Sequence, residues 1–522
     1  MITKTEIIES FYQDSVILMR IAGQIRKRAG VIEALLFMGT PANQELLRQI
    51  GFGTAESIKA TANDLIITIN AITEQNADEG ISAAKDLLVA RRQTCEASKE
   101  YRARTLESAI RLMPNANLVT ISVPGAYAGF EAMKAIRRGL HVFLFSDNIP
   151  LEEELKLKKE AVKRGIFCMG PDQGTAYING IGLGFANVVP RGRIGLIAAS
   201  GTGMQAVAAR VNALGEGISH GIGVGGRDLS QKIGGIMTEF AFNTLSHDVA
   251  TEAIILISKP ICFSAKSKIK EYIKNVNKPV IICCVGESDF TVEGVISVTT
   301  LNEAADAAVA VLKGQTWQSK NFEDHRIIRD KVDRINGFDA FAGCKILGLF
   351  TGGTLAYESH YLLNSLIGPV GYNQSQYEYS THVIIDLGDD AFTIGRPHPM
   401  IDPQIRTDMV LEMGEKFQNN ILLFDLVLGK GAHANPAESI ATAVHEIHEK
   451  FRKQSRPFIA LASIVGTTAD PQDLHLQKKM LHDAGIEVFA SNAEAARFAA
   501  LLVRPDLYRA LIGDGLCSKK IF

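Results

Sequence analysis

The sequence has no excess of either charge, no long apolar run and no paired cysteines. Its 55 Lys and Arg residues nearly balance 57 Asp and Glu residues, which argues against a nucleic-acid or membrane-surface partner. The seven cysteines form no CxxC pair, so we expect reduced thiols in a cytoplasmic protein. No apolar run is as long as the roughly 18 residues that a membrane-spanning helix needs. The opening segment MITKTEIIES lacks the apolar stretch of an export signal. No GxxxxGK[ST] segment occurs, which argues against a P-loop nucleotide hydrolase.

The same turn occurs twice. In each case an apolar strand runs into a Ser/Thr-Gly turn that opens a helix, within Gly192–Val211 and again within Cys344–Leu363. Such a turn leaves backbone N–H groups at the positive end of a helix dipole, and small side chains let an anion approach them. The predicted phosphate-binding residues are therefore Ser200, Gly201, Thr202 and Gly203, with Thr351, Gly352, Gly353 and Thr354. A tight structural corner is the alternative for each turn alone.

The segments that follow the two turns also match. Lys278–Gly286 resembles Arg456–Gly466, and Gly294–Leu312 aligns without a gap on Gly485–Val503. The second copy is longer, and we expect its extra residues to include Ile384–Pro403. In both copies strands alternate with helices, which predicts α/β domains with parallel, doubly wound sheets.

Before the repeat, two further regions are expected. The first is a small α+β domain with strands at Ser15–Arg20, Val31–Met38 and Asp64–Asn70. The second is a parallel sheet that includes Ala116–Val123 and His141–Ser146. A charged segment of helical period, 315–342, is predicted to be a linker helix.

The least generic segment, DLGDDAFTIGRPHPMIDP, supplies the catalytic candidates. Its prolines hold an Arg and a His in an extended loop; Arg suits a carboxylate or phosphate, and His can exchange a proton near neutral pH. A metal site and a solvated loop are both open alternatives, although no spacing is diagnostic of a metal and none is predicted. The catalytic candidates are Asp389, Asp390, Arg396 and His398, and Asp402 is a substrate-binding candidate.

Two other loops supply further substrate-binding candidates. GPDQGTAYI places Asp172 at the carboxyl edge of a sheet, where open α/β folds bind ligands; an Asp-capped loop is the alternative. GIGVGGRDL carries Arg227. Its GxGxxG pattern does not open a helix and has no acidic partner at a convincing distance, which argues against dinucleotide binding.

These motifs carry a family resemblance. From about Ala116 to Leu312 the chain resembles the α subunit of succinyl-CoA synthetase, through GPDQGTAYI, GRIGLIAASGTG, GIGVGGRDL and TEAIILISKP. The block from Cys344 is similar to the carboxy-terminal domain of the β subunit. In that family the two helix ends bind the phosphate of a phosphohistidine loop. Here the corresponding segment, Val285–Val298, contains no His, and no ATP-grasp domain precedes the second block.

The chain closely resembles the FdrA family in the order of its fused α-like and β-like blocks and in three segments: DSVILMR, MGTPANQELL and GRPHPMIDP. The resemblance implies five regions: an N-terminal α+β domain (1–92), a Rossmann-like CoA-binding-type domain (93–190), a flavodoxin-like domain of the α-subunit type (191–314), the linker helix (315–342) and a flavodoxin-like domain of the β-subunit type (343–522).

The resemblance also implies a function. It is that of a subunit of an oxamate carbamoyltransferase in anaerobic allantoin breakdown, which moves a carbamoyl group between oxalurate and phosphate. Expected partners are phosphate, carbamoyl phosphate, oxalurate, oxamate and separately encoded subunits, in a dimer or larger assembly. No cofactor is expected; CoA or a nucleotide would bind only if the chain were an acyl-CoA synthetase. A non-catalytic scaffold is the other alternative.

Overall fold

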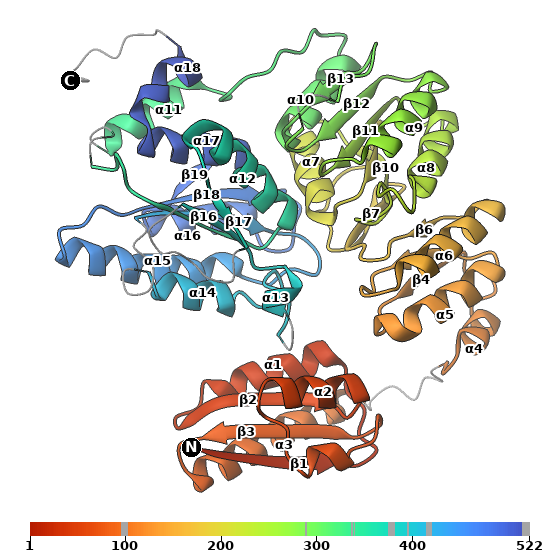
Figure 1. Ribbon diagram of the computed structural model, residues 1–522, viewed down its shortest axis with the longest axis vertical. Helices are drawn as coiled ribbons and strands as arrows, with labels where there is room; N and C mark the ends of the chain where they lie inside the picture. Colours follow the sequence, from red (N-terminus) through yellow and green to blue (C-terminus); the bar gives the residue numbers. More distant parts are fainter. Residues whose placement is uncertain are drawn as a thin grey trace. The chain divides into compact units, whose positions relative to one another are not determined.

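The structure is a computed structural model that describes residues 1–95, 103–287, 290–335, 338, 340–373, 382–393, 396–413 and 420–513 (Figure 1). Contacts divide the chain into two units. One comprises Met1–Arg104 with Asp390–His398, and the other comprises Thr105–Asp389 with Pro399–Phe522.

The first unit is an α+β domain, as predicted. Its sheet has the order β1-β3-β2 with antiparallel pairing throughout. Alternate residues of β2 face opposite layers: Leu36 packs with α1 and α3, whereas Phe37 packs with α2. The elements are β1 (Ile2–Ile8), α1 (Ser15–Arg26), β2 (Val31–Met38), α2 (Pro41–Gln49), the 3-10 helix η1 (Ser57–Lys59), β3 (Leu65–Ala71) and α3 (Glu74–Cys95); α13 (Asp390–Thr393) is grouped with them.

One predicted strand of this domain is wrong. Ser15–Arg20 begins helix α1, and the strand that precedes it, β1, was not predicted. Leu18, Ile21, Ala22 and Ile25 are all buried, which is the spacing of one helix face. This pattern outweighs the strand preference of the β-branched residues at the start of the helix.

The second unit begins with a Rossmann-like sheet of three parallel strands, in the order β4-β5-β6. The two longer helices connect these strands, as expected of βαβ units. The elements are α4 (Leu106–Leu112), β4 (Leu118–Ile121), α5 (Gly125–Arg137), β5 (His141–Leu144), α6 (Leu151–Lys163) and β6 (Cys168–Met169).

The next sheet has the order β13-β12-β11-β9-β10-β7-β8. The five strands from β13 to β10 are parallel, whereas the hairpin β7–β8 adds antiparallel strands at one edge. The parallel part has the 2-1-3-4-5 order of flavodoxin-like folds. The elements are β7 (Thr175–Ile178), β8 (Ile181–Gly184), β9 (Ile194–Ala198), α7 (Gly201–Ala213), β10 (Ile218–Gly223), α8 (Ile236–His247), β11 (Ala253–Ser258), α9 (Phe263–Lys274), β12 (Val280–Cys284), β13 (Ile296–Val298) and α10 (Leu301–Leu312).

The last sheet repeats this order. Its six strands are all parallel and run β15-β16-β14-β17-β18-β19, so the short β15 is added outside a second 2-1-3-4-5 arrangement. The elements are α11 (His325–Arg334), β14 (Ile346–Phe350), α12 (Gly353–Ile367), β15 (Gly371–Tyr372), β16 (Val383–Asp386), α14 (Gln404–Leu411), β17 (Ile421–Val427), α15 (Pro436–Lys453), β18 (Ile459–Val465), α16 (Leu474–Asp483), β19 (Glu487–Phe489), α17 (Asn492–Val503), η2 (Pro505–Leu507) and α18 (Tyr508–Ile512).

The two flavodoxin-like sheets therefore correspond element by element, with β9 and α7 matching β14 and α12. The expected insertion needs correction, because Ile384 and Ile385 lie in β16, which corresponds to β10. The additional residues of the second copy are spread over several connections between core elements.

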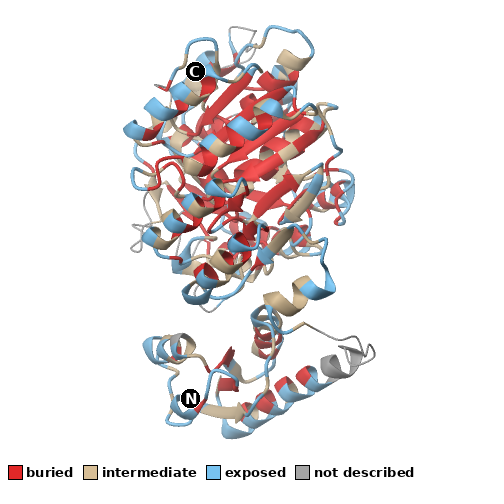
Figure 2. Cartoon of the chain, turned by 90° about the vertical axis from the view of Figure 1, so that its right-hand side faces the viewer, coloured by how far each residue is buried: buried red, intermediate tan, exposed pale blue. Residues whose placement is uncertain are grey.

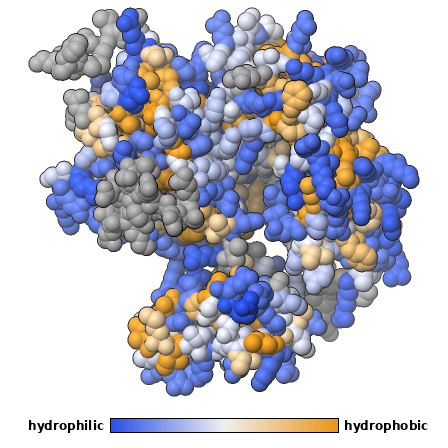
Figure 3. Space-filling model, viewed as in Figure 1, coloured by the Kyte–Doolittle hydropathy of each residue, from blue (hydrophilic) through white to orange (hydrophobic). Residues whose placement is uncertain are grey.

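Burial follows the layers. Figure 2 shows buried strands behind helices whose outer faces are exposed, as expected when helices cover both faces of a parallel sheet. On the face drawn in Figure 3, hydrophobic residues form scattered patches on a largely hydrophilic surface. Among the described residues, no helix combines the length and apolar character needed to cross a membrane.

Candidate functional site

The two predicted turns lie at the start of α7 and of α12, and these helix ends meet. The hydroxyls of Ser200 and Thr354 are hydrogen-bonded to each other. A Cβ placed on Gly352 would lie 3.2 Å from Cβ of Thr202. Each helix follows the first strand of its 2-1-3-4-5 arrangement, β9 or β14, beside the point where the strand order reverses. Open α/β folds bind ligands at this point. The structure thus brings together the two turns that the sequence repeats.

At the α7 end, two backbone donors remain available. The Ser200 hydroxyl caps the helix by accepting a hydrogen bond of 3.0 Å from the amide of Gly203. Throughout the described ranges, no protein group accepts a hydrogen bond from the amides of Gly201 and Thr202. These two N–H groups are therefore the donors that α7 can offer to an anion.

At the α12 end, the protein supplies its own anion. The Asp425 carboxylate accepts hydrogen bonds from the Thr351 amide at 2.8 Å, from the Thr351 hydroxyl at 3.0 Å and from the Gly352 amide at 2.7 Å. Within the part of the chain that the structure covers, the amides of Gly353 and Thr354 donate to no protein acceptor. The donors that α12 can offer therefore begin at Gly353.

Asp425 lies on β17 and is fully buried with Arg406 of α14. Nη1 of Arg406 donates to the Asp425 backbone oxygen at 2.5 Å and lies 3.3 Å from its Oδ1. Burial raises the pKa of Asp425, and Arg406 and the donors at Thr351 and Gly352 oppose that rise. This pair fixes the geometry of the α12 end.

A second carboxylate, Asp386, stands at the carboxyl end of β16. A Cβ on Gly353 would lie 2.4 Å from Asp386 Oδ2, so the carboxylate is directly beside the α12 end. Its Oδ1 accepts a hydrogen bond of 3.0 Å from the Gly388 amide. Burial raises the pKa of Asp386 to about 6, although the charge of Lys259 acts against the rise.

Lys259 comes from the other flavodoxin-like sheet. It follows β11 and is exposed, with Nζ 5.7 Å from the centre of the Tyr357 ring of α12. In the next loop, a Cβ on Gly286 would lie 3.0 Å from the same ring. The carboxyl edges of the two sheets thus place a cation, a carboxylate and helix-end amides around the start of α12.

The GPDQGT loop lies next to the α7 end. A Cβ on Gly201 would be 3.1 Å from the Thr175 hydroxyl, and that hydroxyl donates to the backbone oxygen of Phe185 at 2.6 Å. The candidate Asp172 is exposed, and its amide donates to Ser146 O at 3.1 Å. The loop therefore bounds the space beside Gly201.

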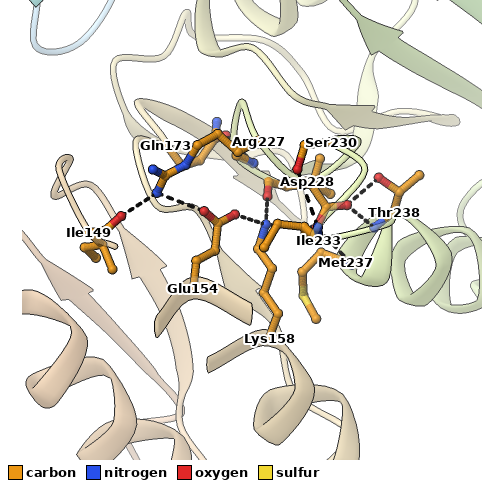
Figure 4. Close-up of polar contacts among 12 residues, drawn as sticks. Ile149, Glu154, Lys158, Gln173, Arg227, Asp228, Ser230, Ile233, Met237 and Thr238 are labelled. Carbon is orange, nitrogen blue, oxygen red and sulfur yellow. Dashed lines mark hydrogen bonds and ion pairs between the residues drawn. The ribbon is translucent and has the colours of Figure 1, made fainter. Parts of the chain in front are cut away.

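The candidate Arg227 is half-exposed and lies at the edge of an ionic cluster whose other members, Glu154, Lys158 and Asp228, are buried (Figure 4). Its Nη2 donates to Ile149 O at 2.8 Å and pairs with Glu154 at 2.9 Å. Lys158 of α6 contacts Glu154 at 2.7 Å and Asp228 at 2.9 Å. Because these charges pair one another, the arrangement is that of a domain junction and does not single out Arg227 for a substrate.

The remaining catalytic candidates are divided between the two units. Contacts group Asp390–His398 with the N-terminal unit, so the roles proposed for Asp390, Arg396 and His398 stay predictions. Arg396 is exposed, and burial lowers the pKa of His398 to about 4, so its imidazole is neutral at pH 7. Asp389 accepts a hydrogen bond of 3.2 Å from Asn373 Nδ2.

Asp402 has a local structural role. Its Oδ1 accepts a hydrogen bond of 3.1 Å from the Gln404 amide, at the start of α14. This contact is typical of an Asx turn. A contribution of Asp402 to substrate binding stays a prediction. In the portion of the chain that the structure describes, no group of three or more His, Cys, Asp and Glu side chains is arranged to hold a metal ion.

Sequence reasoning missed three residues of this site. Asp425 interrupts the apolar strand ILLFDLV, and a charge inside a buried strand is a usable signal. Lys259 follows a buried strand, as strand-end ligand groups do. Arg406 carried no comparable signal, because its burial depends on the packing of α14 against the rest of the domain.

Comparisons with known proteins agree with this architecture. A CoA-ligase family model matches residues 349–502, and a model of the AllF heavy metal-associated domain matches residues 1–104. The succinate–CoA ligase [ADP-forming] α subunit of Methanothermobacter thermautotrophicus is 28% identical over 167 residues, which are 31% of this chain and 55% of that protein. The strand orders and these matches define a succinyl-CoA synthetase-like α/β protein with a CoA-ligase domain.

A full-length relative gives the family. The chain is 36% identical over 512 residues to the uncharacterized protein YahF of Escherichia coli strain K12, which covers 96% of this chain and 98% of that protein. The chain belongs to the family of YahF.

Solved structures are more distant. The protein PH0766 of Pyrococcus horikoshii OT3 is 16% identical with a TM-score of 0.34, over 78% of this chain and 88% of that one. The dinucleotide-forming acetyl-coenzyme A synthetase 1 of Ca. Korarchaeum cryptofilum is 14% identical with a TM-score of 0.30, over 76% and 84% of the two chains. The fold assignment rests on the strand order and on the family models.

Proposed function

We propose that this chain is the phosphate-binding subunit of an oxamate carbamoyltransferase, and that it belongs to the FdrA branch of its family. The enzyme would cleave oxalurate with phosphate to give oxamate and carbamoyl phosphate in the cytoplasm. The observation that carries the proposal is the contact between the α7 and α12 ends, where Ser200 meets Thr354. The match of residues 1–104 to an AllF domain supports a place in allantoin breakdown.

The chemistry of the helix ends fits a free phosphate. The amides of Gly201, Thr202, Gly353 and Thr354 point from two helix N-termini, which favour an anion and would stabilise charge in the transition state. Lys259 adds a positive charge from the neighbouring loop. The segment Val285–Val298 contains no His, so a phosphohistidine would not compete for this space.

Two other functions make different predictions. The CoA-ligase match favours an acyl-CoA synthetase as the second candidate, which would form acyl-CoA and ADP from an acid, CoA and ATP. As a scaffold, the chain would support partner subunits that carry the whole active site.

The deciding experiment assays the purified complex with and without this chain, in both directions. We expect phosphate-dependent cleavage of oxalurate, and formation of oxalurate from oxamate and carbamoyl phosphate, only when the chain is present. Full turnover without the chain would favour the scaffold. Formation of acyl-CoA and ADP would favour the synthetase.

A further inference from the structure

Asp386 is a buried carboxylate to which the resemblance gives no role. It ends β16 and has 8% of its surface exposed. Oδ1 is held by the Gly388 amide, whereas in the described segments no donor reaches Oδ2, the oxygen that faces Gly353. The backbone amide of Asp386 donates to Asn373 Oδ1 at 2.7 Å, which fixes this end of the strand. One carboxylate oxygen is thus anchored and the other is directed at the helix end.

The contrast with Asp425 separates the two carboxylates by role. Asp425 has its oxygens occupied by Thr351, Gly352 and Arg406 and cannot exchange a proton without breaking the α12 end. Among the described residues, the Asp386 carboxylate accepts one hydrogen bond, from the Gly388 amide, and it lies beside the Gly353 amide, which donates to no described acceptor. We propose that Asp386 carries the proton that must move during carbamoyl transfer at this site; this role rests on the proposed function.

The reaction moves one proton from the phosphate to the leaving nitrogen. An oxygen of hydrogen phosphate attacks the carbamoyl carbon of oxalurate, so that a C–O bond forms and the C–N bond to the oxamate nitrogen breaks. The phosphate loses one proton and the leaving nitrogen gains one. A carboxylate that accepts the first proton and returns it to the nitrogen balances the step without an added reactant.

The surroundings of Asp386 suit this exchange. Burial raises its pKa to about 6, so that both protonation states are populated near neutrality. The charged and titratable groups around it are Lys259 after β11, Asp389 in its own loop, Asp425 on β17 and Tyr372 on β15. Lys259 favours the carboxylate and the two aspartates oppose it.

The first test follows turnover. In the intact complex, Asp386→Asn should lower kcat by about 10²–10⁴-fold and abolish the limb of the kcat/KM profile near pH 6, because the amide cannot exchange the proton. The matched control is Asp483→Asn, a change at an exposed carboxylate at the end of α16, which should leave both unchanged. The inference would be overturned if the wild type transfers the carbamoyl group and Asp386→Asn keeps full kcat and an unchanged pH profile. The proposed function would still stand in that case.

The second test is independent of turnover and uses sulfate, which stays a dianion between pH 5 and 8. Ionised Asp386 repels an anion held beside Gly353, so sulfate affinity of the wild type should fall as the pH rises. A coupling of one pKa unit corresponds to about a tenfold change. Asp386→Asn should lose this dependence, and the same slope in both proteins would contradict the placement of Asp386 at the anion. If the wild type transfers no carbamoyl group, the proposed function and this role both fail, and the sulfate result still decides whether Asp386 faces an anion.

Discussion

Asp425 and Asp386 lie beside the same helix end, yet their donors differ. Asp425 takes two amides, a hydroxyl and a guanidinium group, whereas Asp386 takes one amide. Four donors can compensate a buried carboxylate for the water that it loses, but one donor does not. Ionisation of Asp386 therefore lowers the free energy of unfolding, and the ionised carboxylate lies beside the proposed anion site.

This cost predicts a pH-dependent effect of Asp386→Asn on stability. The pKa of Asp386 is raised from 3.8 to about 6, so the folded protein binds its proton more tightly than the unfolded chain does. Protonated Asp386 therefore stabilises the folded wild type relative to the unfolded chain, and this contribution is lost as the pH rises from about 4 to 6. The variant has no carboxylate at this position to ionise. Relative to the wild type, the free energy of unfolding of Asp386→Asn should thus increase by up to about 3 kcal/mol between pH 4 and pH 7.

Urea unfolding at several pH values measures this difference, with Asp483→Asn as the exposed control. A difference between Asp386→Asn and the wild type that does not change with pH would contradict the raised pKa.

At the scale of elements, α6 is joined to the loop after β10 by the buried ions of Figure 4. Lys158 is fully buried, and its Nζ donates to Glu154, to Asp228 and to the backbone oxygen of Val224 at 2.8 Å. Asp228 also caps α8, by accepting hydrogen bonds from the amide and hydroxyl of Thr238. The cluster thereby connects α6 of the Rossmann-like domain with the loop after β10 and with α8 of the first flavodoxin-like domain.

Lys158→Met should consequently destabilise the protein by about 3–5 kcal/mol, because it leaves two buried carboxylates without their shared cation. Thermal or urea unfolding checks this. The matched control is Lys159→Met, at the next and exposed position of α6, which should change stability by less than about 0.5 kcal/mol. Equal effects of the two substitutions would show that the buried cluster does not hold the junction.

The sequence predicted these elements unevenly. The repeat located α10 and α17, and the structure ends both helices at corresponding residues, Leu312 and Val503. It also paired the α7 and α12 turns, because pseudo-symmetry relates segments that are far apart in the chain. The strand predicted at Ser15–Arg20 was wrong, because strand preference and helical spacing compete in that short segment. The occupation of the Thr351 turn by Asp425 could not be read from the sequence, because it depends on the register of β14 with β17.

At the scale of the whole molecule, the larger unit repeats one flavodoxin-like arrangement and joins the copies at their helix ends. Asn187, in the segment before β9, donates to Asp470 after β18 at 2.8 Å. Val188 adds a backbone hydrogen bond to the same carboxylate at 2.6 Å. These contacts, together with that between Ser200 and Thr354, hold the copies in the orientation that creates the proposed anion site.

Calorimetric titration of phosphate into the purified chain tests this site most directly, using the wild type, Gly201→Val, Gly352→Val and the control Ala213→Val at the exposed far end of α7. In Gly201→Val the new side chain would press against Thr175 beside the α7 amides. In Gly352→Val it would press against Asp425, Leu355 and Thr202, and so disturb the contact between the two helix ends. Neither glycine has a positive φ, so lost space is the expected cause.

We predict that the wild type and Ala213→Val bind phosphate alike. Both glycine variants, with folding verified by circular dichroism, should bind it about a hundredfold more weakly, since each hydrogen bond lost to a charged group removes about 1.5–3 kcal/mol. Unchanged phosphate affinity in correctly folded Gly201→Val and Gly352→Val would contradict an anion site between α7 and α12.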